Sequence, residues 1–472
     1  MNKYKKLLGN SIVLTLGNFG SKFINFFLVP LYTAVLTTSE YGTVDIINTT
    51  TNLLIPLLTV ELGQAVIRYA IADNTEDSHE SILSNTIMHT LAISLILLFL
   101  YPVINYFGIF GGYTNSFLIL LIFRLFNQIL SSYVRGVGKI KAFALNGILM
   151  TVVTVLSNIV LLLNFKMGID GYILSMNIAA ITSTIYLSFV VSGRKFLSIS
   201  SINFTQYKEM VKFSLPLVPN SMMWWLINGA TRYFILFFVG ASGNGLFAVA
   251  NKIPTIITTF QVIFSQAWQL SSFEEYESEG RDEYYTNVFN SYSAFLFIMI
   301  SALLVVNKPL MSIFAAKDYF ESWKLVPFLL LAVVFQSYSN FLGMLYTASK
   351  NTTKAFTTSV YGGIASIVAN FVFVPIIGTI GATIATAISF FVMFVFRFFD
   401  TKKYAEIKVD SIAFVGSLIV YLSQVLILFL IEGTLLYVIQ VFGLLLILLL
   451  NYRIILNMIK MIVKSIRGIL SK

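Results

Sequence analysis

Long apolar stretches separated by short polar segments repeat along the whole chain. A helix needs about 20 mainly apolar residues to cross the roughly 30 Å hydrocarbon core of a bilayer. Fourteen stretches meet this requirement, with approximate limits 9–32, 43–70, 82–107, 115–133, 143–165, 170–192, 213–240, 245–270, 287–306, 324–346, 355–376, 380–399, 411–431 and 434–452. Strands of a membrane barrel are about half as long and alternate in polarity. The pattern therefore predicts an all-α polytopic membrane protein with about fourteen transmembrane helices.

The basic residues are unevenly distributed over the predicted loops. The chain holds 31 Lys and Arg against 21 Asp and Glu, a formal net charge of +10. With the N terminus in the cytoplasm, the basic residues of the outer loops are Lys166, Lys308, Lys317 and Lys324. Lys and Arg concentrate in cytoplasmic loops, so both termini are predicted to be cytoplasmic. The basic surplus then reflects topology and contact with membrane lipids, and no nucleic-acid partner is expected.

The chain contains an internal duplication. The matched residues share type and spacing: Lys22 with Arg232, Asn18 with Asn228, Ser11 with Ser221, Gly42 with Gly245, Gly168 with Gly378, and Gly171 with Gly381. Each repeat comprises six predicted helices, and an even number of spans gives both repeats the same orientation in the membrane.

The duplication predicts the domain organisation. It consists of an N-terminal lobe, a basic cytoplasmic connector, a C-terminal lobe, and a last segment with two further helices and a basic cytoplasmic tail. Their predicted limits are 1–192, 193–212, 213–400 and 401–472. The two lobes are expected to face each other.

Polar residues occupy one face of the first predicted helix. Ser11, Thr15, Asn18, Lys22 and Asn25 recur every three or four residues, which places them on one stripe. A cation in the middle of a membrane costs at least ~2.5 to 3.5 kcal/mol on insertion scales, so the stripe is expected to face protein or water. Because the duplication repeats this cation, we expect a polar cavity between the lobes.

Several cations and amides within or at the ends of the predicted helices are candidates for binding an anionic substrate. The predicted substrate-binding residues are Lys22, Arg232, Arg124, Asn18, Asn228, Lys252 and Arg68. A structural alternative is open for each of the cations: Lys22 could reach the interface or pair with Asp45 or Glu61, and positive-inside topology also explains Arg68.

Two carboxylates, Asp45 and Glu61, lie well inside the predicted helices, both on the second one. Buried carboxylates can bind H⁺ or Na⁺ in response to a gradient, so both are predicted ion-coupling residues. The alternative is that they only neutralise Lys22.

Several kinds of chemistry lack the residues they need. Cysteine is absent, which excludes disulfides and thiol chemistry. The stretch RGVGKIK, 135–141, lacks the spacing of a phosphate-binding loop, so ATP is not the expected energy source. The two histidines, His79 and His89, form no metal-binding motif. No cofactor is expected, and the outer-loop carboxylates form no catalytic constellation, so the chain is not predicted to be an enzyme.

Three stretches resemble the polysaccharide (Wzx-type) flippases of the MOP superfamily, relatives of the MATE exporters. They are GNSIVLTLGNFGSKFINFFLVPLYTAVLTTSEYG (9–42), VRGVGKIKAF (134–143) and FSLPLVPNSMMWWLINGATRYFI (213–235). The duplicated set of twelve helices followed by two more also matches this family. The resemblance implies a V-shaped fold of two lobes that alternates between inward-open and outward-open states.

The resemblance also implies a function. Such proteins export an oligosaccharide linked to undecaprenyl pyrophosphate across the bacterial cytoplasmic membrane, driven by an ion gradient, with cationic residues on the head group. Partners would be the lipid-linked substrate, membrane lipids and other polysaccharide-assembly proteins. The excess of cations over carboxylates within the helices independently favours an anionic substrate. Two alternatives are a MATE-like exporter of cationic drugs and a non-transporting scaffold of envelope polysaccharide assembly.

Overall fold

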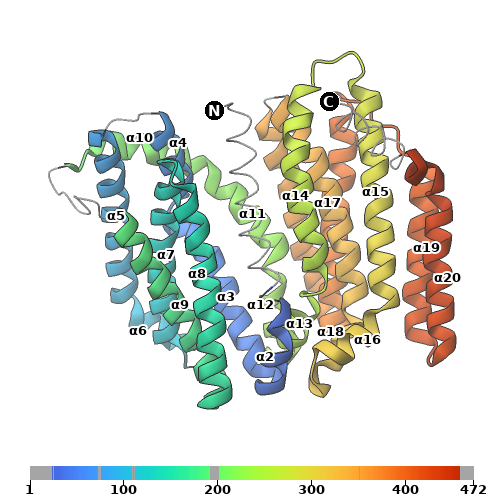
Figure 1. The fold of residues 1–472 in the computed structure, drawn as a ribbon, viewed down its shortest axis with the longest axis horizontal. Coiled ribbons are helices and arrows are strands. Elements are labelled where there is room, and N and C mark those ends of the chain that lie inside the picture. The colour runs from blue at the N-terminus through green and yellow to red at the C-terminus, as the bar shows by residue number, and fades with distance from the viewer. Residues whose placement is uncertain are drawn as a thin grey trace, which may run out of the picture. The chain divides into compact units, whose positions relative to one another are not determined.

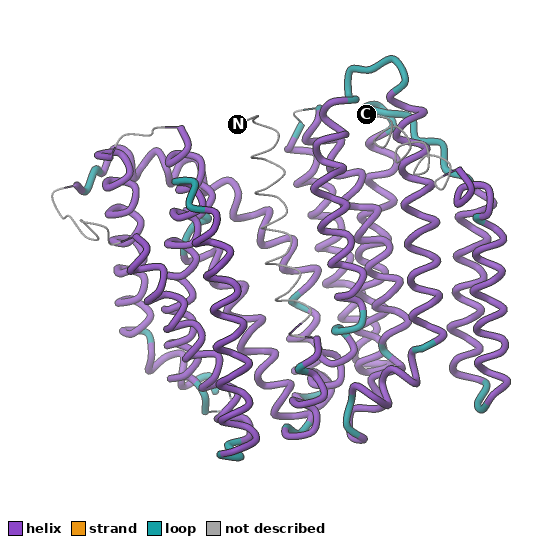
Figure 2. The backbone as a smooth tube through the Cα atoms, in the orientation of Figure 1, coloured by secondary structure: helices purple, strands orange, loops and turns teal. Residues whose placement is uncertain are grey.

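The fold was analysed in a computed structural model that describes residues 24, 26–72, 76–108, 110, 112–191, 201–349 and 351–457. Every regular element in these ranges is a helix (Figure 2). The N-terminal half contains α2 (Val29–Val35), α3 (Thr38–Leu58), α4 (Leu62–Ala72), α5 (Glu76–Phe99), α6 (Tyr101–Tyr106), α7 (Thr114–Gly136), α8 (Ile140–Asn158), η1 (Ile159–Asn164), α9 (Gly168–Val191), α10 (Phe204–Ser214), η3 (Leu215–Leu217), α11 (Val218–Asn228) and α12 (Thr231–Phe238). The remainder contains α13 (Ala241–Ala250), α14 (Pro254–Glu274), α15 (Arg281–Val305), α16 (Asn307–Phe314), η4 (Lys317–Lys324), α17 (Val326–Ala348), α18 (Thr352–Thr401), α19 (Ser411–Leu430) and α20 (Thr434–Leu450).

Within the described ranges, 8 helices are long and apolar enough to cross a membrane, or up to 10 when two bent pairs each count as one span. The prediction of an all-α polytopic membrane protein is confirmed. The number fourteen stays a prediction, because four predicted helices are not counted separately. The first predicted helix, 9–32, lies largely outside the described residues. The structure has the short helices α11 and α12 in the stretch 213–240 and the single helix α18 over both 355–376 and 380–399. The last predicted helix, 434–452, forms α20, which has 17 residues.

The chain divides into two compact units, Met1–Gly245 and Leu246–Lys472. This division follows packing, whereas the predicted lobes follow the sequence duplication and meet at the connector 193–212. The lobe limits therefore stay a prediction. One structural feature is consistent with the duplication: the matched glycines both have positive φ, 56° for Gly168 at the first residue of α9 and 59° for Gly378 inside α18.

In unit 1, α3 and α4 form a broken helix with a bend of 51° (Figure 1). The sequence predicted one continuous helix over 43–70, and the break replaces its middle. Pro56 lies within the last turn of α3, and both Val60 and Glu61 have positive φ, 50° and 54°. Such values are unusual for residues other than glycine, above all for a β-branched one, so neighbouring elements must hold the break in place.

Helix α10 begins in the predicted connector, ends two residues beyond it at Ser214, and packs on the broken helix. Asn203 caps its first turn, accepting from the backbone N–H groups of Thr205 and Gln206. Its Met210 is buried with Leu62 and Ala65 of α4. Asn85 on α5 accepts from the Asn203 N–H at 3.1 Å and so fixes the start of α10.

The start of α3 approaches the first residues of α13 closely. A Cβ added to Gly42 would lie 1.9 Å from the carbonyl oxygen of Ala241, and one added to Gly245 would lie 1.9 Å from that of Thr38. Only glycine permits this backbone approach at both positions.

The core of unit 2 is rich in stacked aromatic rings. Trp268 on α14 stacks on Phe341 of α17 at 4.2 Å between ring centroids and donates its indole N–H to the carbonyl of the same residue. Helices α19 and α20 run side by side and are joined by Gln424 and Gln440, each of which donates to the other's backbone carbonyl (Figure 1). Ser301 of α15 donates to Gln424, which attaches this helix pair to the rest of unit 2.

Helix α18 has a break of a different kind. Its backbone leaves helical geometry at Ile377 and Gly378, which lies between the predicted helices 355–376 and 380–399. The left-handed position is occupied by glycine, so this break involves little steric strain.

Candidate functional site

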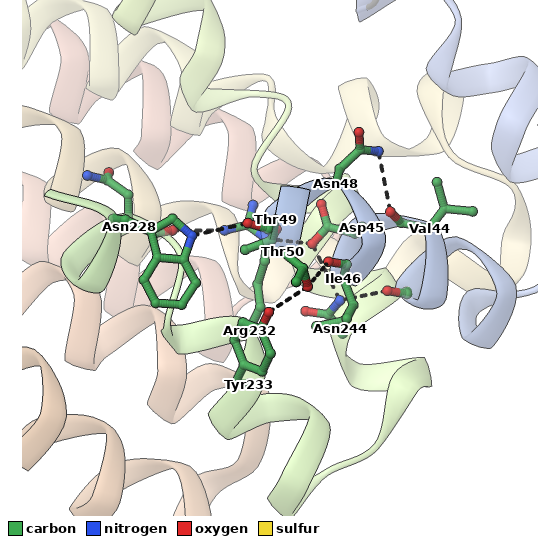
Figure 3. Close-up of polar contacts among 12 residues, drawn as sticks. Val44, Asp45, Ile46, Asn48, Thr49, Thr50, Asn228, Arg232, Tyr233 and Asn244 are labelled. Atoms are coloured by element: carbon green, nitrogen blue, oxygen red, sulfur yellow. Dashed lines mark hydrogen bonds and ion pairs between the residues drawn. The ribbon is translucent and has the colours of Figure 1, made fainter. Parts of the chain in front are cut away.

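The candidate site lies in unit 1, where α3 meets α11, α12 and the first turn of α13. Arg232 of α12 donates from Nε to Oδ2 of Asp45 on α3 at 2.5 Å (Figure 3). The two side chains keep 15% and 19% of their surface exposed, so the ion pair borders accessible space and is not sealed in a core. An ion pair inside a membrane compensates two charges that would each be costly alone.

Both members of this pair have further contacts. Nη1 of Arg232 donates to the backbone carbonyl of Asn228 at 2.8 Å. Asn244 of α13 donates to the carbonyl of Gly42 at 2.9 Å and to Asp45 at 3.4 Å. The close packing at Gly42 thus places an amide beside the carboxylate, and the arginine and the carboxylate are each oriented by a second group.

A second arginine contacts α3 one turn further along. Arg124 of α7 donates from Nη2 to Oδ1 of Asn48 at 3.0 Å. Its Nε is buried and has no hydrogen-bond partner among the described residues. Asp45 and Asn48 are three residues apart and lie near one another on the helix surface, so α3 presents a carboxylate and an amide to two arginines from different helices.

Glu61 lies in the break between α3 and α4. Ser221 of α11 donates its hydroxyl to Oε1 of Glu61. Asp45 therefore has a charged partner, whereas the hydrogen bond to the side chain of Glu61 comes from a neutral hydroxyl.

The remaining predicted residues are distributed over several places. Arg68 is on the exposed side of α4, with its guanidinium 4.3 Å from the centroid of the Phe213 ring. The Asn228 side chain donates to the carbonyl of Trp224 at 2.8 Å. Lys252 belongs to unit 2 and follows α13. Lys22 and Asn18 lie outside the described residues.

The structure thus brings together Arg232, Asp45 and Asn228, and separately pairs Arg124 with Asn48. The sequence left Lys22 open as a partner of Asp45, whereas the partner in the described part of the chain is Arg232. The binding and coupling roles of all these residues stay predictions. Among the described residues, no group of three His, Cys, Asp or Glu could hold a metal ion.

Three residues beside Arg232 were missed in the sequence. The Tyr233 hydroxyl lies 2.5 Å from the Thr50 hydroxyl, and the Trp225 indole N–H donates to the carbonyl of Thr49 at 3.1 Å (Figure 3). With Asn244 they bind α3 to α11, α12 and α13. Aromatic residues are too frequent in this chain to select by composition, but both lie in the stretch 213–235 that carries the resemblance.

Unit 2 contains a buried arginine that the sequence analysis also did not select. Arg397 of α18 is only 3% exposed. It donates to the hydroxyls of Thr358 and Ser359 and to the carbonyls of Ser339 and Ala355. A cation within the predicted helix 380–399 was the available signal.

The all-helical fold of the described residues is also found in solved structures of membrane transporters. The chain is similar to the lipid II flippase MurJ in an inward closed conformation, with a TM-score of 0.73, 14% identity, and coverage of 95% of this chain and 100% of MurJ. It is also similar to an inward-facing MATE multidrug transporter of the MOP superfamily, with a TM-score of 0.69, 12% identity, and coverage of 81% and 95%. At these identities the likeness defines the fold.

The family follows from the sequence. Residues 7–269 match the family described as polysaccharide biosynthesis protein, and the chain belongs to this family. No curated protein matches the chain. The predicted resemblance to polysaccharide flippases thus agrees with the family match, and the fold is that of MurJ and the MATE transporter.

Proposed function

We propose that this protein moves an oligosaccharide linked to undecaprenyl pyrophosphate from the inner to the outer leaflet of a bacterial cytoplasmic membrane by alternating access. Family membership supports a lipid-linked glycan as substrate. The observation that carries the proposal is the ion pair between Arg232 and Asp45. It holds a guanidinium within the predicted membrane-spanning region, next to accessible space, where an anionic ligand can bind it.

The first proposed step is an exchange of partners at Arg232. A guanidinium presents its N–H groups in a planar fork that fits a phosphate group as well as a carboxylate. An arriving pyrophosphate, with at least two negative charges, competes with Asp45 for Arg232. Asp45 therefore occupies the head-group position on Arg232 while no substrate is bound.

The second step links binding to ion coupling. An ionised carboxylate that loses its cationic partner inside a membrane is destabilised, which favours uptake of H⁺ or binding of Na⁺. Head-group binding and ion binding at Asp45 then promote each other. Glu61, which accepts from the neutral Ser221 hydroxyl, is the second proposed coupling residue.

The test is export of the glycan in cells carrying Arg232→Ala at a matched protein level, together with binding of undecaprenyl pyrophosphate to the purified protein. We expect both to fall strongly. A drug exporter would instead bind organic cations, and more weakly after Asp45→Asn. A scaffold would keep glycan export normal in Arg232→Ala, and either result would refute the proposal.

We also propose that both termini and the connector face the cytoplasm. Because the chain has no cysteine, single cysteines can report topology without removal of native thiols. In intact cells, a membrane-impermeant thiol reagent should label Lys317→Cys and leave Ser200→Cys unlabelled. The reverse pattern would invert the topology.

A further inference from the structure

The two histidines of the chain lie on one helix and bind the same broken helix. Both are on α5, and each has Nε2 close to a carbonyl oxygen in the last turn of α3 or of α4. Nε2 of His89 lies 2.8 Å from the carbonyl oxygen of Leu58 at the end of α3. Nε2 of His79 lies 3.1 Å from the carbonyl oxygen of Ala70 in α4. A carbonyl oxygen only accepts, so Nε2 carries the proton in both rings.

His89 has a second contact. Its Nδ1 lies 2.8 Å from the hydroxyl of Tyr207 on α10. In the neutral ring with its proton on Nε2, Nδ1 is an acceptor, and the Tyr207 hydroxyl can donate to it. The two hydrogen bonds fix the orientation of the imidazole between the connector helix α10 and the end of α3.

The break places unusual demands on the backbone. A helix end leaves its last carbonyls without intrahelical donors, and inside a membrane such groups need partners. The carbonyls of Ile55, Pro56 and Leu57 accept from Thr59, Glu61 and Val60, respectively. The next carbonyl, that of Leu58, accepts from Nε2–H of His89, which lies outside the broken helix.

The same backbone segment determines where Glu61 points. Val60 and Glu61 are both left-handed, at φ of 50° and 54°, a conformation that surrounding structure must impose. With this backbone the Glu61 carboxylate accepts from Ser221 on α11. If the carbonyl of Leu58 lost its partner, a return toward regular helix would be favoured and would rotate Glu61 away.

We propose that His89 is a positioning residue, which holds the break between α3 and α4 so that Glu61 faces Ser221. Through Tyr207 it links the connector helix to this break. The consequence for transport rests on the proposed coupling role of Glu61, whereas the positioning itself does not.

The positioning is tested without transport. In the cysteine-free chain, Glu61→Cys and Ser221→Cys are combined and treated with a short bifunctional thiol reagent. His89→Gln places an amide N–H near the position of Nε2 and should keep cross-linking at the parent level. His89→Asn is too short to reach the carbonyl of Leu58 and should reduce cross-linking several-fold. Tyr207→Phe removes only the hydroxyl and should cause a smaller decrease.

His79 is the matched control, because it binds the other half of the broken helix away from Glu61. His79→Gln and His79→Asn should both cross-link like the parent. Equal cross-linking of the His89→Asn and parent proteins would overturn the proposal. A loss of cross-linking in His89→Gln as large as that in His89→Asn would also overturn it. If His89→Asn does not fold, unchanged cross-linking in Tyr207→Phe overturns it.

Export separates this proposal from the proposed function. With Glu61 present, His89→Asn should lower glycan export to the level of Glu61→Gln, and His89→Gln should restore it. If Glu61→Gln exports normally, the coupling role of Glu61 is wrong, and the cross-linking result alone decides the role of His89.

Discussion

Two arginines, one in each unit, bind their surroundings in opposite ways. Arg232 in unit 1 is paired with the Asp45 carboxylate, and both side chains keep some exposure. Arg397 in unit 2 is enclosed and donates to neutral hydroxyl and carbonyl oxygens of α17 and α18. The contrast separates an arginine that can exchange its partner for a ligand from one that holds helices together.

The physical reason lies in what each arginine would leave behind. A phosphate that takes Arg232 from Asp45 frees a single carboxylate, which can be neutralised by an ion. Arg397 binds several groups at once, and Gly343 leaves room for it: a Cβ there would lie 2.7 Å from its Nη1. Movement of Arg397 would leave several buried oxygens unpaired, which strongly disfavours any exchange.

The largest effect is expected for Arg397→Leu. The variant removes the donors for the hydroxyls of Thr358 and Ser359 and for two backbone carbonyls. It should destabilise the protein by about 1 to 3 kcal/mol for each buried acceptor left unpaired. Thermal unfolding and the yield of monodisperse protein measure this loss of stability. The stability of Arg397→Lys should lie between that of the parent and that of Arg397→Leu. A variant that unfolds like the parent but cannot export would place Arg397 in the transport mechanism and abolish the comparison.

The second effect is loss of export in Arg232→Ala with the fold retained. One lost charge-assisted contact of about 1.5 to 3 kcal/mol corresponds to roughly 10- to 150-fold weaker head-group binding. Arg232→Lys should be milder if charge matters more than the planar fork. The double variant Arg232→Ala, Asp45→Asn controls for the carboxylate left unpaired. Should its export recover to the parent level, the structural alternative for Arg232 would be correct.

The sequence predicted the helices well, because about twenty apolar residues in a row admit few alternatives. It also selected Arg232, Asp45 and Glu61, since charges are rare within such stretches. It did not predict which charges pair, because pairing depends on helices far apart in the chain. The break at Val60 was missed for the same reason: the stretch IPLLTVELG (55–63) has one proline and no glycine before Gly63, and His89 of α5 binds the carbonyl of Leu58.

A smaller effect of opposite sign is expected for Asp45→Asn. This variant removes the carboxylate that competes for Arg232, so undecaprenyl pyrophosphate should bind more tightly, by about tenfold, within the usual range of coupling energies. Export should nevertheless slow, because the head group is released less readily and ion uptake at this position is lost. Binding by the purified protein at several pH values measures both effects. Weaker binding by Asp45→Asn would show that Asp45 contributes to the site and does not compete for Arg232.

The smallest effect is expected at Arg124, whose contact on α3 is the neutral amide of Asn48. Arg124→Gln keeps a donor for Asn48 and removes the charge, so head-group binding should fall by only about two- to tenfold, the equivalent of roughly 0.5 to 1.5 kcal/mol. Asn48→Asp sharpens the comparison, because it gives Arg124 a carboxylate like the one that holds Arg232. If partner exchange governs this site, the new carboxylate should weaken binding of undecaprenyl pyrophosphate at high pH and less so at low pH, where its protonated form no longer competes. Equal binding by the Asn48→Asp and parent proteins at all pH values would mean that Arg124 does not reach the head group. The proposed function would then require partner exchange in unit 1 at Arg232 alone.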